Sequence, residues 1–155
     1  MFNVKNANGT ISWVLLFAGI ALTVLYLIFA EPIISTFYVG SDTFADTMYD
    51  YNMYFILASL MSVTVWALAA IYYWIIDKVK LSSFVWWMLF GIAAAAIVPF
   101  IFFYYPMGVF LEENLEFEVD LVNLAIIALP FTIVYYFLIS ICIKSFSTNC
   151  STRPF

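Results

Sequence analysis

Four long stretches of this sequence carry no charged residue, and they limit its fold more than any other feature. The fifteen charged side chains leave uncharged runs of 25, 26, 31 and 23 residues at positions 6–30, 51–76, 81–111 and 121–143. A helix needs about 20 apolar residues to cross a hydrocarbon core of about 30 Å. Each run has room for one crossing, so we predict membrane spans at about residues 10–30, 51–76, 81–105 and 121–143.

The composition agrees with a protein whose surface faces lipid. Hydrophobic residues make up 66% of the 155 residues, charged residues only 10%, and the mean hydropathy is +1.06. So few charges could not cover a water-exposed fold of this size. Runs such as Leu22–Ala30 and Gly91–Ile97 lack the alternation of a β-barrel strand. The sequence therefore predicts an all-α integral membrane protein, a single transmembrane domain of four helices in an antiparallel bundle.

The charges separate by sign between alternate connections. The basic residues lie before the first span, between the second and third, or after the fourth: Lys5, Lys78, Lys80, Lys144 and Arg153. Every acid except Asp77 lies in the other two connections, residues 31–50 and 106–120. Basic flanks stay in the cytoplasm, so we expect both termini there and two acidic loops outside. A cleaved signal peptide is a weaker alternative for the first span, because the apolar run from Ile11 is longer than a usual signal core.

The first acidic loop is expected to contain a short helix. Ser41 precedes Asp42 as a helix N-cap would, and Asp42, Asp46 and Asp50 then follow at intervals of four. That spacing places the three carboxylates along one helix face. They form a docking face for a cationic partner, a weak cation site or, as we prefer, the solvated entrance to the second span.

The second acidic loop holds five acids in nine residues: Glu112, Glu113, Glu116, Glu118 and Asp120. Leu115, Phe117 and Val119 alternate with the last three of these acids, which predicts a short strand or an extended peptide with one apolar edge. Binding of a partner's exposed domain and simple solubility of an external loop account for it equally well.

Small residues mark two candidate helix-packing faces. Ala58 and Ser62 lie four apart in the second span, as do Gly91 and Ala95 in the third. Small side chains at this spacing let two helix backbones approach closely in lipid, where packing replaces the hydrophobic drive. The pattern leaves open whether the neighbour is another span of this chain or another subunit.

Proline and aromatic residues add detail. Pro99 and Pro130 lie inside spans and predict kinks, whereas Pro32 and Pro106 follow the two outward spans. Most aromatic clusters fall at predicted span ends and indicate interfacial anchoring: Trp13, Tyr72–Trp74, Trp86–Trp87 and Tyr104–Tyr105. Tyr135–Tyr136 lies deeper, where phenolic hydroxyls need hydrogen-bond partners, so it predicts a helix contact.

Groups that usually carry chemistry are missing from the sequence. It contains no histidine, and no charged residue falls in the middle of a span. These absences remove the usual metal and haem ligand and the groups that ion-coupled transporters need. The deepest polar residues suit hydrogen bonds between helices: Thr23, Ser59, Ser62, Thr64, Asn123, Thr132 and Ser140. We expect no catalytic residue, metal or cofactor.

The functional hypothesis rests on the missing catalytic and transport groups. It rests also on features that suit association with other proteins, namely the small-residue helix faces, the apolar aromatic exterior and the two acidic loops. We expect a non-enzymatic structural or accessory subunit of a larger membrane complex, in contact with lipids and with other subunits or copies of itself but not with nucleic acid. A prokaryotic plasma membrane is the simplest location. The alternative is an oligomeric channel or carrier for cations or a small neutral solute. An interfacial lipid enzyme using Asp46 or Glu116 is a third possibility.

Overall fold

The computed structural model describes residues 9–38, 40–76, 83–112, 117–147 and 149–150. Within these residues every regular element is helical, and four helices are long and apolar enough to cross a membrane. These are α1 (Gly9–Ile28), α4 (Met53–Ala70) with its π-helical extension η1 (Ile71–Ile76), α5 (Phe84–Glu112) and α6 (Glu118–Ile143). Shorter elements are α2 (Ala30–Phe37), α3 (Asp42–Asp50) and the 3-10 helix η3 (Lys144–Phe146). The predicted all-α membrane fold is confirmed.

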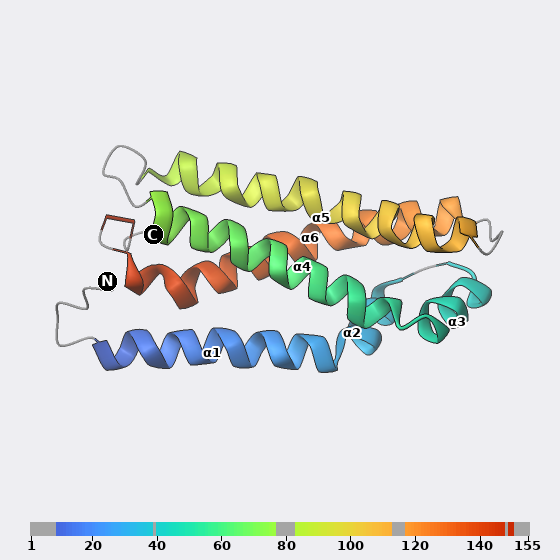
Figure 1. Cartoon of the computed structure of the whole chain (residues 1–155), viewed down its shortest axis with the longest axis horizontal. Coiled ribbons are helices and arrows are strands. Elements are labelled where there is room, and N and C mark those ends of the chain that lie inside the picture. Colours follow the sequence, from blue (N-terminus) through green and yellow to red (C-terminus); the bar gives the residue numbers. More distant parts are fainter. Residues whose placement is uncertain (1–8, 39, 77–82, 113–116, 148, 151–155) are drawn as a thin grey trace.

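The four long helices run antiparallel to one another in chain order (Figure 1). The first turns of α1 therefore lie beside η3, and the rings of Trp13 and Phe146 pack edge to face with centroids 5.4 Å apart. Helices α4 and α6 each contact the three other long helices, and the most extensive contact in the bundle is that between α5 and α6. The short helices α2 and α3 lie at the opposite end of the bundle, which we call the acidic end after Glu31, Asp42, Asp46, Asp50, Glu118 and Asp120.

The connection between α1 and α4 is two short helices rather than an open loop. The backbone breaks at Phe29, which has φ −102° and ψ 17°, and α2 begins one residue later. Pro32 lies in the first turn of α2, where its missing N–H removes no helical hydrogen bond. The helix is therefore interrupted before the proline, at Phe29, and α2 continues through Pro32. Between α3 and α4, Asn52 takes the left-handed conformation with φ 56°, which asparagine tolerates better than most residues.

At the other acidic connection, two expectations from the sequence are wrong. Helix α5 does not end at Tyr105 but continues through Pro106 to Glu112. A break there would leave several backbone groups unpaired in lipid, whereas one proline removes a single bond. The short strand or extended peptide predicted in the acidic segment is also wrong where the structure describes it, because Glu118, Val119 and Asp120 form the first turn of α6, while residues 113–116 lie outside the described residues. Acids are favoured at that position by the helix dipole.

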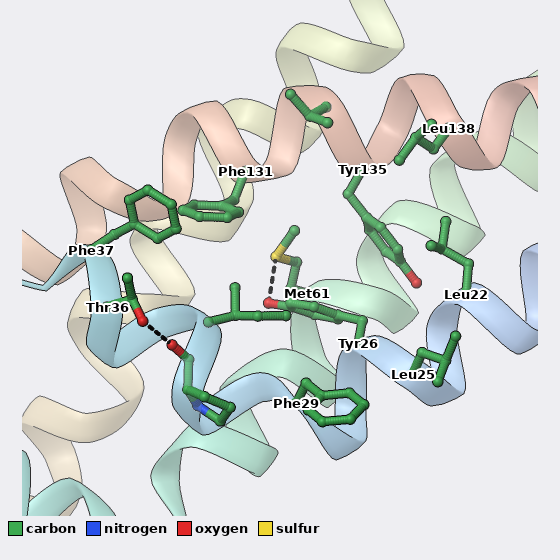
Figure 2. A pocket seen from close by; sticks show the side chains of 13 residues that line it. Leu22, Leu25, Tyr26, Phe29, Thr36, Phe37, Met61, Phe131, Tyr135 and Leu138 are labelled. Atoms are coloured by element: carbon green, nitrogen blue, oxygen red, sulfur yellow. Dashed lines mark hydrogen bonds between the residues drawn. The ribbon is translucent and has the colours of Figure 1, made fainter.

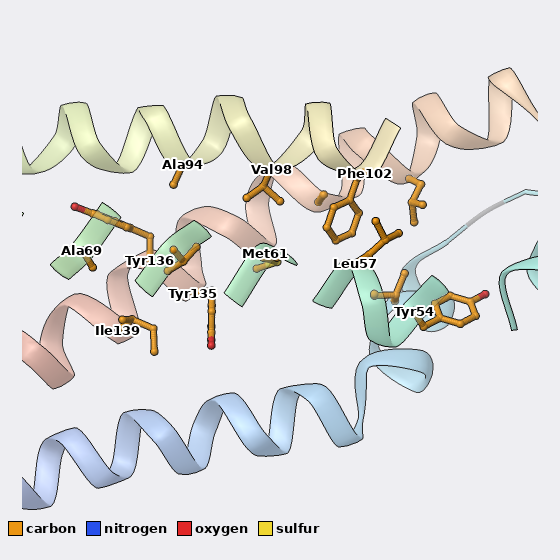
Figure 3. Close-up of a cluster of buried hydrophobic side chains, with 14 of the residues drawn as sticks. Tyr54, Leu57, Met61, Ala69, Ala94, Val98, Phe102, Tyr135, Tyr136 and Ile139 are labelled. Carbon is orange, nitrogen blue, oxygen red and sulfur yellow. The ribbon is translucent and has the colours of Figure 1, made fainter. Parts of the chain in front are cut away.

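The core is filled by large side chains from α4, α5 and α6. Figure 3 shows Leu57 and Met61 of α4 on the side that faces Val98 and Phe102 of α5, with Ile139 of α6 further along the bundle near Ala69, all of them buried. Pro99 and Pro130 lie inside α5 and α6 as predicted.

Two core tyrosines correct an expectation from the sequence. Tyr72 and Tyr73 were expected among the interfacial aromatics, yet both are fully buried, with ring centroids 4.9 Å apart. They lie in the π-helical turn η1, whose wider backbone departs from regular helical spacing. The ring of Tyr72 packs against that of Phe90 on α5, with centroids 5.6 Å apart, so contacts with the neighbouring helix bury this end of the second span.

A hydrogen-bonded hub joins three helices inside the bundle. The indole Nε1–H of Trp66 on α4 donates to Thr23 Oγ1 on α1 at 2.9 Å. Thr23 donates its own proton to the Gly19 carbonyl at 2.9 Å, so the Tyr135 hydroxyl of α6, 2.7 Å away, must be a donor to Thr23. The threonine hydroxyl thus makes all three bonds available to it. This contact confirms the prediction that Tyr135 marks a helix contact.

We expect Thr23→Val to destabilise the bundle by about 1–2 kcal/mol, because it leaves two donors from other helices unpaired in a low-dielectric interior. Thr64→Val is the matched control, since Thr64 is equally half-buried and bonds only to the Leu60 carbonyl of its own helix. The free energy of unfolding in detergent checks both variants. Equal losses in the two would contradict the role assigned to the hub.

Candidate functional site

The four predicted helix-packing residues divide into two different settings. Ala58 and Ser62 of α4 are buried inside the protein, at 0% and 4% exposure. They are therefore used for packing within this chain. The Ser62 hydroxyl has no hydrogen-bond partner among the described residues.

Gly91 lets α5 approach α6 closely. A β-carbon added to Gly91 would lie 3.2 Å from Cδ1 and Cε1 of Tyr136, tighter than ordinary packing. The same tyrosine donates its hydroxyl proton to the Trp87 carbonyl at 3.3 Å, and Trp87 Nε1–H donates to Ser140 Oγ at 3.1 Å. These bonds confirm the predicted helix contact at Tyr136 and fix the spacing of α5 and α6.

Gly91 also lines an open groove, together with Ala95. This α5–α6 groove has a volume of about 430 Å³. Both small residues lie on its α5 side, where they are half-buried. The remaining lining is almost entirely apolar, from Phe84, Trp87, Met88, Ile92, Ile133, Val134, Tyr136 and Phe137. The small-residue pattern in the third span therefore serves an internal contact and also leaves a recess on the surface of the bundle.

A second groove lies between α6 and α1. This α1–α6 groove has a volume of about 570 Å³ and is walled by α1, α2 and α6, with Met61 of α4 at its base (Figure 2). The Tyr26 hydroxyl donates to Met61 Sδ at 3.3 Å. At the acidic end the rings of Phe37 and Phe131 pack edge to face with centroids 5.1 Å apart. This groove could not be predicted from the sequence, because it depends on the distance of α1 and α2 from α6.

The three aspartates of α3 lie as their spacing predicts. Ser41 is the N-cap, and its Oγ accepts a hydrogen bond from Phe44 N–H at 3.3 Å. Asp42, Asp46 and Asp50 are exposed, whereas Phe44 of the same helix is buried beneath them. Helix α3 therefore presents an acidic face outward and packs its apolar face against the bundle.

Asp120 has a different setting from the other predicted docking acids. Its carboxylate accepts a hydrogen bond from the Tyr38 hydroxyl, and two from Ser41, through the backbone N–H at 3.2 Å and Oγ at 3.0 Å. These bonds tie the α2–α3 turn to the first turn of α6. We call Tyr38, Ser41 and Asp120 the clasp. Burial, and then the bond to Asp120, raise the pKa of Tyr38 well above its usual range.

Gly40 shows how closely the clasp is packed. A β-carbon on Gly40 would coincide with the Tyr38 side chain and press on the Asp120 carboxylate. No residue larger than glycine fits there without displacing the clasp.

The remaining predicted docking acids are Glu112, Glu113, Glu116 and Glu118. Glu118 is exposed in the first turn of α6. Glu112 ends α5, but its side chain lies outside the described residues, as do Glu113 and Glu116. Within the described part of the chain, no group of three or more His, Cys, Asp or Glu side chains is placed to hold a metal ion.

Comparisons with protein-family models, with curated protein sequences and with solved structures found no match to this chain.

Replacing Asp120 by asparagine should loosen α3, because the amide keeps only one of the two acceptor oxygens and removes the negative charge from the bonds with Tyr38 and Ser41. Hydrogen bonds to charged groups contribute about 1.5–3 kcal/mol, so we expect amide hydrogen exchange in residues 41–50 to accelerate by about tenfold or more. Asp46→Asn removes the same charge from an exposed position of the same end and should leave exchange unchanged. Similar protection in both variants would show that the clasp does not hold α3.

Proposed function

We propose that this protein is a non-enzymatic subunit of a larger membrane assembly and that the α5–α6 groove receives a transmembrane helix of a partner subunit. The observation that carries the proposal is an apolar groove with two small residues, Gly91 and Ala95, on one wall. Helix association in lipid depends on close backbone approach rather than on the removal of apolar surface from water.

The surroundings of the groove suit a helix in shape. Ile92 of α5 and Ile133 of α6 line the groove, and each exposes half or more of its side chain. Side-chain ridges of one helix pack into the grooves of another at spacings of about 8–10 Å. A partner helix would place its own ridge between these isoleucines, above Ala95.

Polar side chains of the described spans form hydrogen bonds within this chain, which supports the same proposal. Thr23 and Ser140 bond to other helices of the bundle, and Thr64 and Thr132 bond to carbonyls of their own helices. None of the buried residues is charged. The interior thus offers packing rather than a lined path, and the surface offers places for association.

Filling the groove should remove the partner. We expect Ala95→Phe to lower the amount of any co-purifying membrane polypeptide at least tenfold after mild detergent extraction from the native membrane. Ala96→Phe is the matched control, because Ala96 is the next residue of α5, is exposed and lies outside the groove lining. Size separation and mass spectrometry of the extracted complexes measure both.

Two results would overturn the proposal. If the wild-type protein migrates alone or only as a homo-oligomer, the oligomeric channel or carrier becomes the better hypothesis. If both phenylalanine variants keep their partner, the partner does not occupy the α5–α6 groove.

We further propose that the acidic end faces outward from the plasma membrane of a prokaryote. The support is the separation of basic and acidic connections in the sequence. In a background with Cys142→Ala and Cys150→Ser, Asp46→Cys should react with a membrane-impermeant maleimide in intact cells. Ser145→Cys, exposed at the other end, should react only after permeabilisation, and the reverse pattern would invert the topology.

A further inference from the structure

We propose that the α1–α6 groove binds one acyl chain of a phospholipid whose headgroup carries an ammonium group. This inference concerns the groove between α6 and α1, which adjoins the partner-helix groove at Val134 but has its own walls, and it does not depend on the proposed function. It rests on the size of the groove, on the residues that line it and on the charge of the end at which it lies.

The dimensions of the α1–α6 groove suit a ligand rather than a packing defect. Its volume of about 570 Å³ lies within the range of about 300–1,000 Å³ usual for small-molecule sites. It extends inward to Met61, which is buried at 1% exposure, so a bound chain would touch the second layer of helices (Figure 2). Ordinary lipid packed against a smooth bundle has no such depth available to it.

The ends of the groove are closed by contacts between its walls. Toward the termini, the Thr23–Tyr135 hydrogen bond of the hub joins α1 to α6. One turn further along α1, Gly19 lies so close to Cys142 that an added β-carbon would be 2.9 Å from Cys142 Cβ. At the acidic end the Phe37–Phe131 ring pair joins α2 to α6. The groove is thus a bounded recess, open sideways.

The lining residues favour a flexible chain over a helix. Leu22, Leu25, Phe29, Phe131 and Leu138 are all large, and the lining contains no glycine, alanine or serine. A helix backbone cannot approach closely over such side chains, whereas an acyl chain can bend between them. This composition separates the α1–α6 groove from the α5–α6 groove, which has Gly91 and Ala95 in its wall.

The charge of the neighbouring end selects the headgroup. Glu31 is exposed in the first turn of α2, directly before Pro32 of the groove lining. The chain has no lysine or arginine between Lys5 and Lys78 or between Lys80 and Lys144. An anionic headgroup at the acidic end would find only carboxylates, whereas an ammonium group would be attracted to them. Phosphatidylethanolamine fits this requirement and phosphatidylglycerol does not.

Native mass spectrometry of the full chain, purified in mild detergent and offered equal amounts of phosphatidylethanolamine and phosphatidylglycerol, tests the proposal. We expect one retained phosphatidylethanolamine in the wild type and at least tenfold less in Leu25→Trp, whose indole would fill the groove. Val24→Trp is the matched control, because Val24 is the adjacent residue of α1, is similarly exposed and lies outside the lining. Leu138→Trp fills the same groove from α6 and replaces Leu25→Trp if that variant does not fold.

The headgroup is tested separately with Glu31→Gln, which should reduce the preference for phosphatidylethanolamine several-fold while a lipid is still retained. Equal retention of the two lipids by the wild type, or a preference for phosphatidylglycerol, overturns the headgroup assignment. Equal lipid retention by Leu25→Trp and Val24→Trp overturns the groove assignment. A polypeptide cross-linked from a photoreactive residue at position 25 would show that a partner helix occupies the groove.

Discussion

Backbone hydrogen bonding in a medium without water governs this structure. Each N–H and C=O group that crosses the hydrocarbon core must be paired within its own helix. The consequences are visible along the described chain, since α5 continues through both Pro99 and Pro106, and α6 through Pro130. In the connections that the structure describes, the backbone leaves the helical conformation at helix ends, as at Phe29, Tyr38, Ser41 and Asn52. Side chains then decide only how complete helices are placed beside one another.

That placement depends on α6. One side of α6 is buried against α4 and α5 through residues such as Leu124, Thr132 and Ile139. The other side exposes Ile126 and Ile133 and is flanked by the two grooves. Specific bonds, the Thr23 hub on one flank and the Tyr136–Trp87–Ser140 set on the other, hold α1 and α5 at fixed distances from it. The two grooves lie at the positions where these bonds do not hold the neighbouring helices in close contact with α6.

The sequence predicts the number and type of the long helices because charge is so costly in lipid that its absence marks each span. Local chemistry also predicts the Ser41 cap and the contacts of Tyr135 and Tyr136. The burial of Tyr72 and Tyr73 was not predictable, because it depends on contacts with other helices, such as that between the rings of Tyr72 and Phe90 of α5. The two grooves depend on distances between segments far apart in the chain. The use of Asp120 within the protein likewise depends on a meeting of residues about 80 positions apart.

The packing at Gly40 has a consequence for which sequences this fold can accept. Gly40 is an exposed residue in the turn between α2 and α3, a setting that ordinarily tolerates almost any amino acid. Here the space for a side chain is already filled by Tyr38 and Asp120. Position 40 therefore has the narrow substitution tolerance of a core residue while it remains in contact with solvent. A larger residue at position 40 would therefore require the side chains at positions 38 and 120 to move or to be replaced.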